Sequence, residues 1–415
     1  MLRSLLPKAH QKFLSMPLLG PIMDGFDDWL AANGFTRSSR KHLICKLWYV
    51  DADLRRRRVY EIAKLTHPVL HDCWRGFMKA HPNNAGTVRT LELYLIDSGL
   101  IADGRKVSAT LPASILAEEY ANHLREVCGF VTSTASHHRW TVQCFLKHLE
   151  DEAVTLRSVQ PGNIESYIAK TGKRLSRAAL QHDIAAVRGF LRFLVMDGRI
   201  TSGLDRQIDT PRLYRLEQLP RALPWETVKT LLQSIDTVSA IGLRDYAMFL
   251  LIATYGLRAS EVVAVTLDDI RWRHGSLRIY QRKTSSPLEL PLTNEVASAI
   301  VKHLKRTPPQ PPHRRVFLRM RAPSGVLKPT AITEAFQSLV RKSGLSIPFQ
   351  GPHCLRHSFA VHLLKNGTPL KTIGDILGHR TAESTSMYLR LATGDLREVA
   401  LEVPDKKQAA KDVQE

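Results

Sequence analysis

The sequence predicts a mainly α protein that carries one small β-hairpin in an α+β domain near its C-terminal end. Over most of the 415 residues, apolar side chains recur three and four positions apart, which is the spacing of amphipathic helices. Residues 276–281 and 287–292 alternate instead, around a polar tip, as the two strands of a hairpin do. Residues 210–224 hold three prolines among basic residues and are typical of an extended linker. We therefore expect helical domains first and a mixed domain after the linker.

Composition narrows the possible functions. The chain has 59 Lys and Arg against 39 Asp and Glu, a formal charge of +20, which favours a polyanionic partner such as nucleic acid. An ordinary basic protein is the alternative. With 44% hydrophobic residues the chain can form real cores, while its best apolar run, residues 247–257, is about half of a membrane span. Five dispersed cysteines and no secretory signal indicate a reduced, cytoplasmic protein.

Residues 1–110 form a predicted helical extension of unclear role. They carry 17 basic and 10 acidic side chains, and the run Arg55–Arg58 is either a DNA-backbone contact or a solvated helix face. No internal repeat is evident in the sequence. The sequence therefore assigns no role to this extension.

Residues 111–205 are predicted to be a helical domain with one basic side. Apolar residues four apart mark a first helix at Leu116, Tyr120 and Leu124, and a second helix carries Trp140, Phe145 and Leu149. Around the third helix, basic side chains outnumber acidic ones, as a domain lying on a duplex requires. The candidate DNA-binding residues are Lys170, Lys173, Arg174, Arg177, Arg188 and Arg192. A merely solvated face is the alternative.

Beyond a linker at residues 206–224, we expect an α+β domain over 225–400 and a tail at 401–415. The predicted helices of the α+β domain are 225–234, 242–254, 330–343, 352–365, 369–377 and 382–391, and the hairpin lies between the second and the third of them. The tail either packs into a neighbouring protomer or is a frayed end.

Four features of this last domain carry candidate chemistry, although each is weak alone. Arg258 and Glu261 are three apart and can meet on one helix face. Lys283 lies at the hairpin tip, and His353 and Arg356 share a helix turn. His379 follows a glycine, and Tyr388 comes nine residues later. Taken one at a time, these residues are typical of structural roles: an ion pair on a helix, a solvent-exposed lysine, a hydrogen-bonding group at the start of a helix and a tyrosine in the core.

Together the same side chains are the parts needed to attack a phosphodiester. Two guanidiniums on the non-bridging oxygens remove the repulsion of a nucleophile and stabilise the extra charge of the transition state. A tyrosine hydroxyl must lose its proton, which an imidazole can take. The leaving oxygen needs a proton, which a lysine can supply.

The order and spacing of these residues resemble the tyrosine recombinase family, in its phage-integrase and Xer-like group. The matching elements are G-L-R-x-x-E at 256–261, the hairpin lysine, H-x-x-R at 353–356, G-H at 378–379 and the tyrosine nine residues later. The resemblance covers residues 113–400 and implies a SAM-like, core-binding domain at 111–205 and a catalytic domain at 225–400. It is strong over 240–391 and rests on pattern alone over 113–200.

This resemblance also implies a role for each matched residue. Tyr388 would form a 3′-phosphotyrosyl link to DNA, and Arg258, Arg356 and His379 would bind the phosphate. Lys283 would protonate the leaving 5′-oxygen, His353 would be the acid–base partner of the tyrosine, and Glu261 would orient Arg258. Arg282 is the alternative candidate for the role given to Lys283.

The resemblance further implies site-specific recombination or integration of DNA, without metal or ATP. The partners would be double-stranded DNA with inverted-repeat sites and a homo-tetramer on it, possibly with related recombinases, at the bacterial nucleoid. A mobile element is one expected setting. The rival functions are a type IB topoisomerase and a catalytically silent DNA-binding protein of the same fold.

Overall fold

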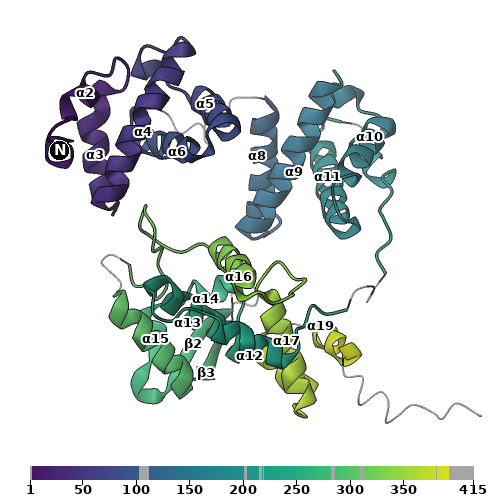
Figure 1. The fold of residues 1–415 in the computed structure, drawn as a ribbon. Helices are drawn as coiled ribbons and strands as arrows, with labels where there is room; N and C mark the ends of the chain where they lie inside the picture. Colours follow the sequence, from purple (N-terminus) through teal and green to yellow (C-terminus); the bar gives the residue numbers. More distant parts are fainter. Residues whose placement is uncertain are drawn as a thin grey trace, which may run out of the picture. The chain divides into compact units, whose positions relative to one another are not determined.

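The computed structural model describes residues 2–101, 112–200, 203–214, 217, 219–281, 286–308, 313–379 and 381–391. The chain divides into two compact units, Met1–Arg215 and Leu216–Glu415. Figure 1 shows helices throughout, with a small sheet only in the second unit. The predicted fold class is therefore confirmed. None of the described helices is long and apolar enough to cross a bilayer.

The first helical part of unit one lies within residues 2–101. Its α-helices are α1 (Leu2–Leu5), α2 (His10–Leu14), α3 (Met23–Ala32), α4 (Arg37–Arg56), α5 (His67–Ala80) and α6 (Pro82–Asp97). Two short 3₁₀ helices, η1 (Gly20–Ile22) and η2 (Ile62–Lys64), join them. Its own apolar core includes Phe26, Leu47 and Leu91.

The second helical part of unit one spans residues 112–214. Its helices are α8 (Pro112–Glu126), α9 (Thr132–Asp151), η4 (Leu156–Ser158), α10 (Pro161–Gly172), α11 (Arg177–Met196) and η5 (Leu204–Arg206). Leu116, Tyr120 and Leu124 are buried as predicted, whereas Trp140 is 66% exposed on α9. Trp140 therefore contributes to the surface rather than to the core.

Unit two contains the sheet and the remaining helices. The helices are α12 (Trp225–Gln233), α13 (Ala240–Tyr255), α14 (Ala259–Val262), α15 (Asn294–Arg306), α16 (Pro329–Ser343), α17 (His353–Lys365), α18 (Leu370–Leu377) and α19 (Glu383–Ser386). Single 3₁₀ turns are η6 (Leu267–Asp269), η7 (Trp272–His274) and η8 (Met387–Leu391). The helix expected over 382–391 is thus divided between α19 and η8, and α15 is not among the helices that the sequence predicts.

The sheet has three antiparallel strands in the order β1 (Ile270–Arg271), β2 (Ser276–Gln281) and β3 (Ser286–Pro291). Residue 277 pairs with 290 and residue 281 with 286. This register confirms the predicted hairpin, whose tip at 282–285 is outside the described residues. The inward side chains of β2, such as Leu277 and Ile279, join the main core.

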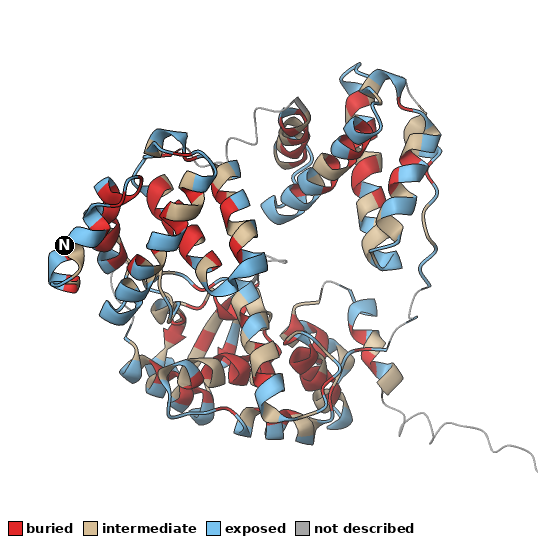
Figure 2. Ribbon diagram, turned by 45° about the horizontal axis from the view of Figure 1, so that its top comes forward, coloured by how far each residue is buried: buried red, intermediate tan, exposed pale blue. Residues whose placement is uncertain are grey.

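Helix α13 lies at the centre of unit two. Its residues 247–253 are all buried, because α12, α15, α16 and α17 pack around it. This explains the long apolar run in the sequence without any membrane span. In Figure 2 buried and exposed residues alternate along the helices, as is typical of amphipathic helices. A separate cluster of Phe359, Ile373, Leu377 and Tyr388 joins α17, α18 and η8.

Candidate active site

The turn after α13 fixes the first arginine of the site. Gly256 ends α13 with a φ of 65°, a left-handed conformation that glycine adopts without strain. Two residues later, Arg258 is the N-cap of α14. Its backbone N–H donates to Glu261 Oε2 over 2.8 Å, and its Nη1 donates to Oε1 over 2.7 Å. Glu261 is 2% exposed, so a buried carboxylate fixes both the backbone and the side chain of Arg258.

The second arginine, Arg356, lies on α17 and is 3% exposed. Its guanidinium donates to the carbonyl oxygens of Gly256 and Leu377, which end α13 and α18. Burial, followed by the charge of Arg258, lowers its pKa to about 10. Arg356 therefore stays charged at neutral pH, close to the second positive charge of Arg258, and the carboxylate of Glu261 partly offsets this pair of charges.

Tyr388, on η8, is 1% exposed and packs on α17. Its hydroxyl lies 3.0 Å from Nδ1 of His357, the residue after Arg356. Burial raises the pKa of Tyr388, while the nearby charges of Arg356 and Arg258 act in the opposite direction. The hydroxyl thus lies within the electric field of both arginines.

His379 follows the C-terminal glycine of α18. Gly378 has a φ of 61°, and a Cβ there would meet the Gln281 side chain at 2.0 Å, so the end of β2 lies directly against this turn. The His379 Nδ1 is 2.8 Å from Thr385 Oγ1, and its ring lies 6.3 Å from that of Tyr388. Burial, then Arg356 and Arg258, lower the pKa of His379 to about 4.

The structure brings most of the predicted site residues together and adds one. Arg258, Glu261, Arg356, His379 and Tyr388 surround one point of unit two. His353 lies 4.6 Å, ring to ring, from His357, which is the residue that contacts the tyrosine. Lys283 and the alternative Arg282 lie outside the described residues.

His357 was missed because its residue type and position also fit a histidine that only packs in the core. The available signal was its position four residues after His353 on a helix, which places the two rings on one face. Burial, then His353, Arg356 and Arg221, lower its pKa to about 4. The imidazole is therefore neutral at pH 7 and its Nδ1 can accept a hydrogen bond from the tyrosine.

The candidate DNA-binding residues of 111–205 fall into two groups. Lys170, Lys173, Arg174 and Arg177 lie at the α10–α11 junction, on the exposed side of this helical part. Arg188 instead donates to the carbonyls of Asp205 and Ile208, and Arg192 pairs with the Asp205 carboxylate at 2.8 Å. These two arginines hold the segment that follows α11 in this structure.

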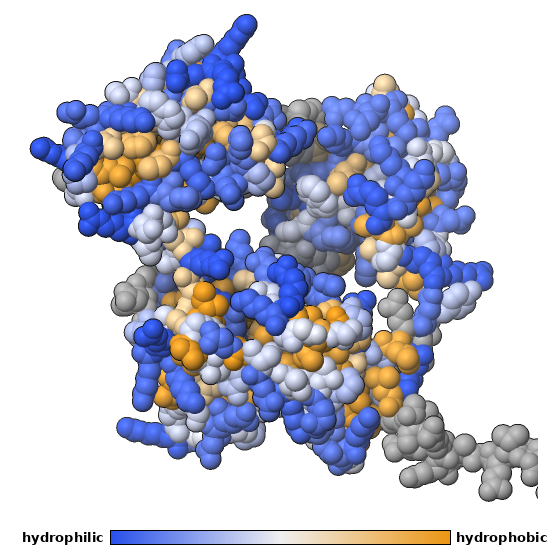
Figure 3. Space-filling model, in the orientation of Figure 1, coloured by the Kyte–Doolittle hydropathy of each residue, from blue (hydrophilic) through white to orange (hydrophobic). Residues whose placement is uncertain are grey.

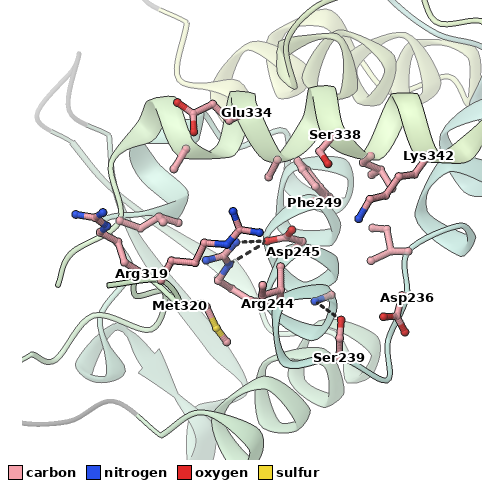
Figure 4. A pocket seen from close by; sticks show the side chains of 18 of the residues that line it. Asp236, Ser239, Arg244, Asp245, Phe249, Arg319, Met320, Glu334, Ser338 and Lys342 are labelled. Carbon is pink, nitrogen blue, oxygen red and sulfur yellow. Dashed lines mark hydrogen bonds and ion pairs between the residues drawn. The ribbon is translucent and has the colours of Figure 1, made fainter. Parts of the chain in front are cut away.

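A cavity of about 660 Å³ in unit two lies away from this site. It is lined by α16, by the turn between α12 and α13, and by residues 319–321 (Figure 4). The Arg244 guanidinium donates to Asp245 within it. None of the candidate catalytic residues that the structure describes lines this cavity.

Comparison with known proteins places this site in a family. The model of the Phage integrase family matches residues 221–394, and that of the Phage integrase, N-terminal SAM-like domain matches 117–198. Over 414 residues the chain is 30% identical to "Putative integrase/recombinase y4rA" of Sinorhizobium fredii, covering 95% of this chain and 98% of that one. This chain belongs to the phage integrase family. As a family member it is a tyrosine-type site-specific recombinase that acts on DNA.

Two further relatives agree with this assignment. The recombinase is 27% identical over 295 residues to tyrosine recombinase XerD of Listeria monocytogenes, covering 68% of this chain and 96% of XerD. The crystal structure of a lambda integrase(75–356) dimer bound to a COC′ core site matches it with a TM-score of 0.53 at 17% identity, covering 70% of this chain and 98% of that one. That second likeness concerns the fold alone.

Proposed function

We propose that Tyr388 of this recombinase attacks the scissile DNA phosphate and forms a 3′-phosphotyrosyl link, releasing a 5′-hydroxyl. The observation that carries this proposal is the hydroxyl of Tyr388, 3.0 Å from an imidazole and within the field of two arginines. The tyrosine oxygen bonds to phosphorus as the bond to the 5′-oxygen breaks, so one phosphoester replaces another. Rejoining needs no ATP because the bond energy is kept, and in this proposal the arginines rather than an added metal stabilise the charge of the transition state.

In this proposal the arginines bind the phosphate. Arg258 and Arg356 would donate to its non-bridging oxygens, and His379 would add a further hydrogen bond. The mutual repulsion of the two guanidiniums supports this role, because a phosphate placed between them removes that repulsion. Glu261 is a positioning residue, since it acts through Arg258.

Proton movements involve the remaining groups. Lys283 would protonate the leaving 5′-oxygen, and this role stays a prediction because residues 282–285 lie outside the described residues. His353 stays the proposed acid–base partner of the tyrosine, acting next to His357. His357 would hold the hydroxyl in position through its Nδ1.

We also propose that each protomer cuts with its own tyrosine. Tyr388 packs in one cluster with Phe359 and Leu377 of the same chain, which supports attack within the protomer. Mixing the Tyr388→Phe and Arg258→Ala variants tests this. Attack within the protomer predicts no covalent adduct from the mixture, whereas restored adduct formation would indicate that the tyrosine is shared between chains.

The proposed substrate is double-stranded DNA with inverted-repeat sites, on which four copies assemble, possibly with related recombinases. The structure of a lambda integrase tetramer bound to a Holliday junction, which matches at a TM-score of 0.52, supports this assembly. We place the reaction in the cytoplasm, at the bacterial nucleoid, because the substrate is DNA. The predicted tail at residues 401–415, either packed into a neighbouring protomer or frayed, lies outside the described residues.

The experiment starts from the duplex that the full chain protects from nuclease. On that duplex, the wild type should give a protein–DNA adduct that survives denaturation, and Tyr388→Phe should bind without forming it. Tyr280→Phe, at an exposed tyrosine on β2, is the matched control and should keep the adduct. An adduct formed by Tyr388→Phe would refute the assignment of the nucleophile.

The same assay separates the rival functions. A silent DNA-binding protein gives no adduct in the wild type. A type IB topoisomerase relaxes a supercoiled plasmid that carries one site but does not exchange strands between two sites. Recombination of a two-site plasmid by the wild type would exclude both rivals.

A further inference from the structure

The two helical parts of unit one repeat the same order of elements. In the first part, α3, the 20-residue α4, η2, α5 and α6 follow one another. In the second part, α8, the 20-residue α9, η4, α10 and α11 do the same. The packing partners correspond as well, because α4 packs on α6 as α9 packs on α11, and α5 on α6 as α10 on α11. The family models match only the second part.

The turns between these helices also correspond, residue by residue. Among described non-glycine residues, only Arg58 and Ala153 have a positive φ, 62° and 55°, and each lies two positions after its 20-residue helix. The next residue returns its N–H to the helix, Val59 to Leu54 O and Val154 to Leu149 O. Such rare backbone conformations at matching positions indicate one shared fold.

The same correspondence holds at both ends of the bundle. Phe35 and Phe130 each follow a left-handed glycine and donate back to Leu30 O and Leu124 O. After α6 and α11, Gly99 and Gly198 have φ values of 68° and 67°. Seven pairs of corresponding positions are buried in both parts, and they are 30 and 124, 47 and 142, 50 and 145, 54 and 149, 88 and 187, 91 and 190, and 95 and 194.

Residue identity is low, which is why no repeat is evident in the sequence. Between α4 and α9, only Ser38 and Ser133, His42 and His137, and Leu54 and Leu149 match. Burial and turn geometry are the same in the two parts although the side chains differ. Hydrophobic cores tolerate such substitutions when the pattern of buried positions and the total volume are kept. The structure therefore indicates a repeat that the sequence alone does not show.

The first copy has a distinct distribution of charge. Within residues 2–101, six carboxylates form ion pairs with basic side chains of the same part, namely with Arg40, Arg55, Arg57, Lys64, Arg75 and Arg89. Nine basic side chains of this part form no ion pair. Five of these nine lie on α1, α2, the turn between them and the first turns of α4, and we call them the N-terminal basic patch: Arg3, Lys8, Lys12, Arg37 and Lys41.

Contacts hold this patch together on one face. The Arg37 Nη2 donates to Ser4 O over 3.0 Å, which joins α4 to α1. The Lys12 ammonium lies 4.7 Å from the centre of the exposed Trp48 ring, which shares a helix face with Lys41. At one edge Asp24 accepts the N–H of Leu2. Hydrophilic residues cover much of this part's visible surface in Figure 3.

We propose that residues 2–101 are a second SAM-like domain and bind duplex DNA through the N-terminal basic patch. The fold repeats that of the domain whose family model matches, and the patch supplies unpaired cations for phosphates. A recombinase with this arrangement contacts DNA with two helical domains of the same fold. The inference extends the proposed function and does not depend on the chemistry of Tyr388.

The test measures binding of the full chain to a labelled duplex of unrelated sequence, in the Tyr388→Phe background so that no covalent step contributes. The patch variant Lys8→Gln, Lys12→Gln, Lys41→Gln should bind about tenfold more weakly, and its slope of log affinity against log salt should fall by about 2 to 3. The matched control Lys64→Gln, Arg75→Gln, Lys79→Gln removes the same charge from η2 and α5 and should change the slope by less than about 1.

A second readout uses the duplex protected from nuclease. The patch variant with Tyr388 intact should still form the covalent adduct, while its protected stretch becomes shorter than that of the wild type. An unchanged slope in the patch variant, or equal losses in both triple variants, would overturn the proposal. Loss of the adduct in every variant would instead count against the proposed chemistry.

Discussion

The hydroxyl of Tyr388 lies 3.0 Å from Nδ1 of His357, and not against His353, the histidine that the sequence pattern selects. His357 follows Arg356 directly, so the helix that presents the buried arginine also holds the tyrosine. With a pKa near 4, its ring is a weak base toward a tyrosine whose own pKa is raised. The contact and the low pKa therefore indicate that His357 positions the hydroxyl rather than takes up its proton.

Substitution of His357 separates positioning from proton transfer. His357→Ala should slow adduct formation about 100-fold, because the hydroxyl loses its only described hydrogen-bond partner and its alignment. His357→Asn should restore most of that rate, since its amide oxygen can accept the same hydrogen bond but cannot take a proton. Single-turnover cleavage measures both, and His274→Asn, at an exposed histidine, is the control. If the Asn variant is as slow as the Ala variant, His357 acts as a base and not only as a hydrogen-bond acceptor.

The depressed pKa values of His357 and His379 predict acid lability. Both histidines are neutral in the fold down to pH about 4 but bind protons near 6.5 when unfolded. The unfolded state therefore takes up more protons in this window, and the free energy of unfolding falls as the pH drops from 6.5 to 4. The loss is at most about 1.4 kcal/mol per pH unit for each histidine.

Urea unfolding at a series of pH values measures this loss. The double variant His357→Asn, His379→Asn should show a flatter dependence on pH than the wild type, and the exposed His274→Asn should follow the wild type. Equal slopes in all three proteins would show that these two rings do not carry the effect.

Much of the site was predictable because local rules determine it. The glycines at 256 and 378 mark helix ends, and the spacing of Arg258 and Glu261 on one turn is the spacing of their ion pair. The partner of Tyr388 was not predictable, since it depends on how η8 packs on α17, a long-range contact. Helix α15 had a signal that was overlooked: Thr293 caps it, and Val296, Ala299, Ile300 and His303 form its buried stripe.

The N-terminal domain shows the opposite situation. Its helices were predictable from periodicity, but its relation to the second domain was not, because the two share turn geometry and burial rather than residues. Arg57 and Arg58 illustrate this. In sequence they continue a basic run, whereas in the structure they lie beyond the end of α4, where Arg58 takes the left-handed conformation of the turn.

Glu261→Gln should impair catalysis more than folding. The amide oxygen can still accept the backbone N–H of Arg258, but the side chain no longer offers two carboxylate oxygens to the guanidinium. We expect a loss of about 1 to 3 kcal/mol in unfolding free energy and weaker phosphate binding. Thermal unfolding and adduct rates measure the two effects. The control Glu226→Gln removes an exposed partner of Lys229 and should change neither, while unchanged adduct rates in Glu261→Gln would contradict the role of this carboxylate.

Gly256→Ala should damage the site in a way that Gly344→Ala does not. Both glycines end a helix with φ near 65°, so either alanine incurs about 1 kcal/mol of backbone strain. Only at Gly256 would the new Cβ also meet Leu377 at 2.6 Å and Phe359 at 2.8 Å, whereas nothing lies within 4 Å at Gly344. Since the carbonyls of Gly256 and Leu377 both hold Arg356, moving either one displaces the buried guanidinium from the position in which we propose that it binds the phosphate. At a temperature where both variants are folded, we expect Gly344→Ala to form the adduct at the wild-type rate and Gly256→Ala to lose most of that rate. Equal rates in the two variants would show that the turn at Gly256 does not position Arg356.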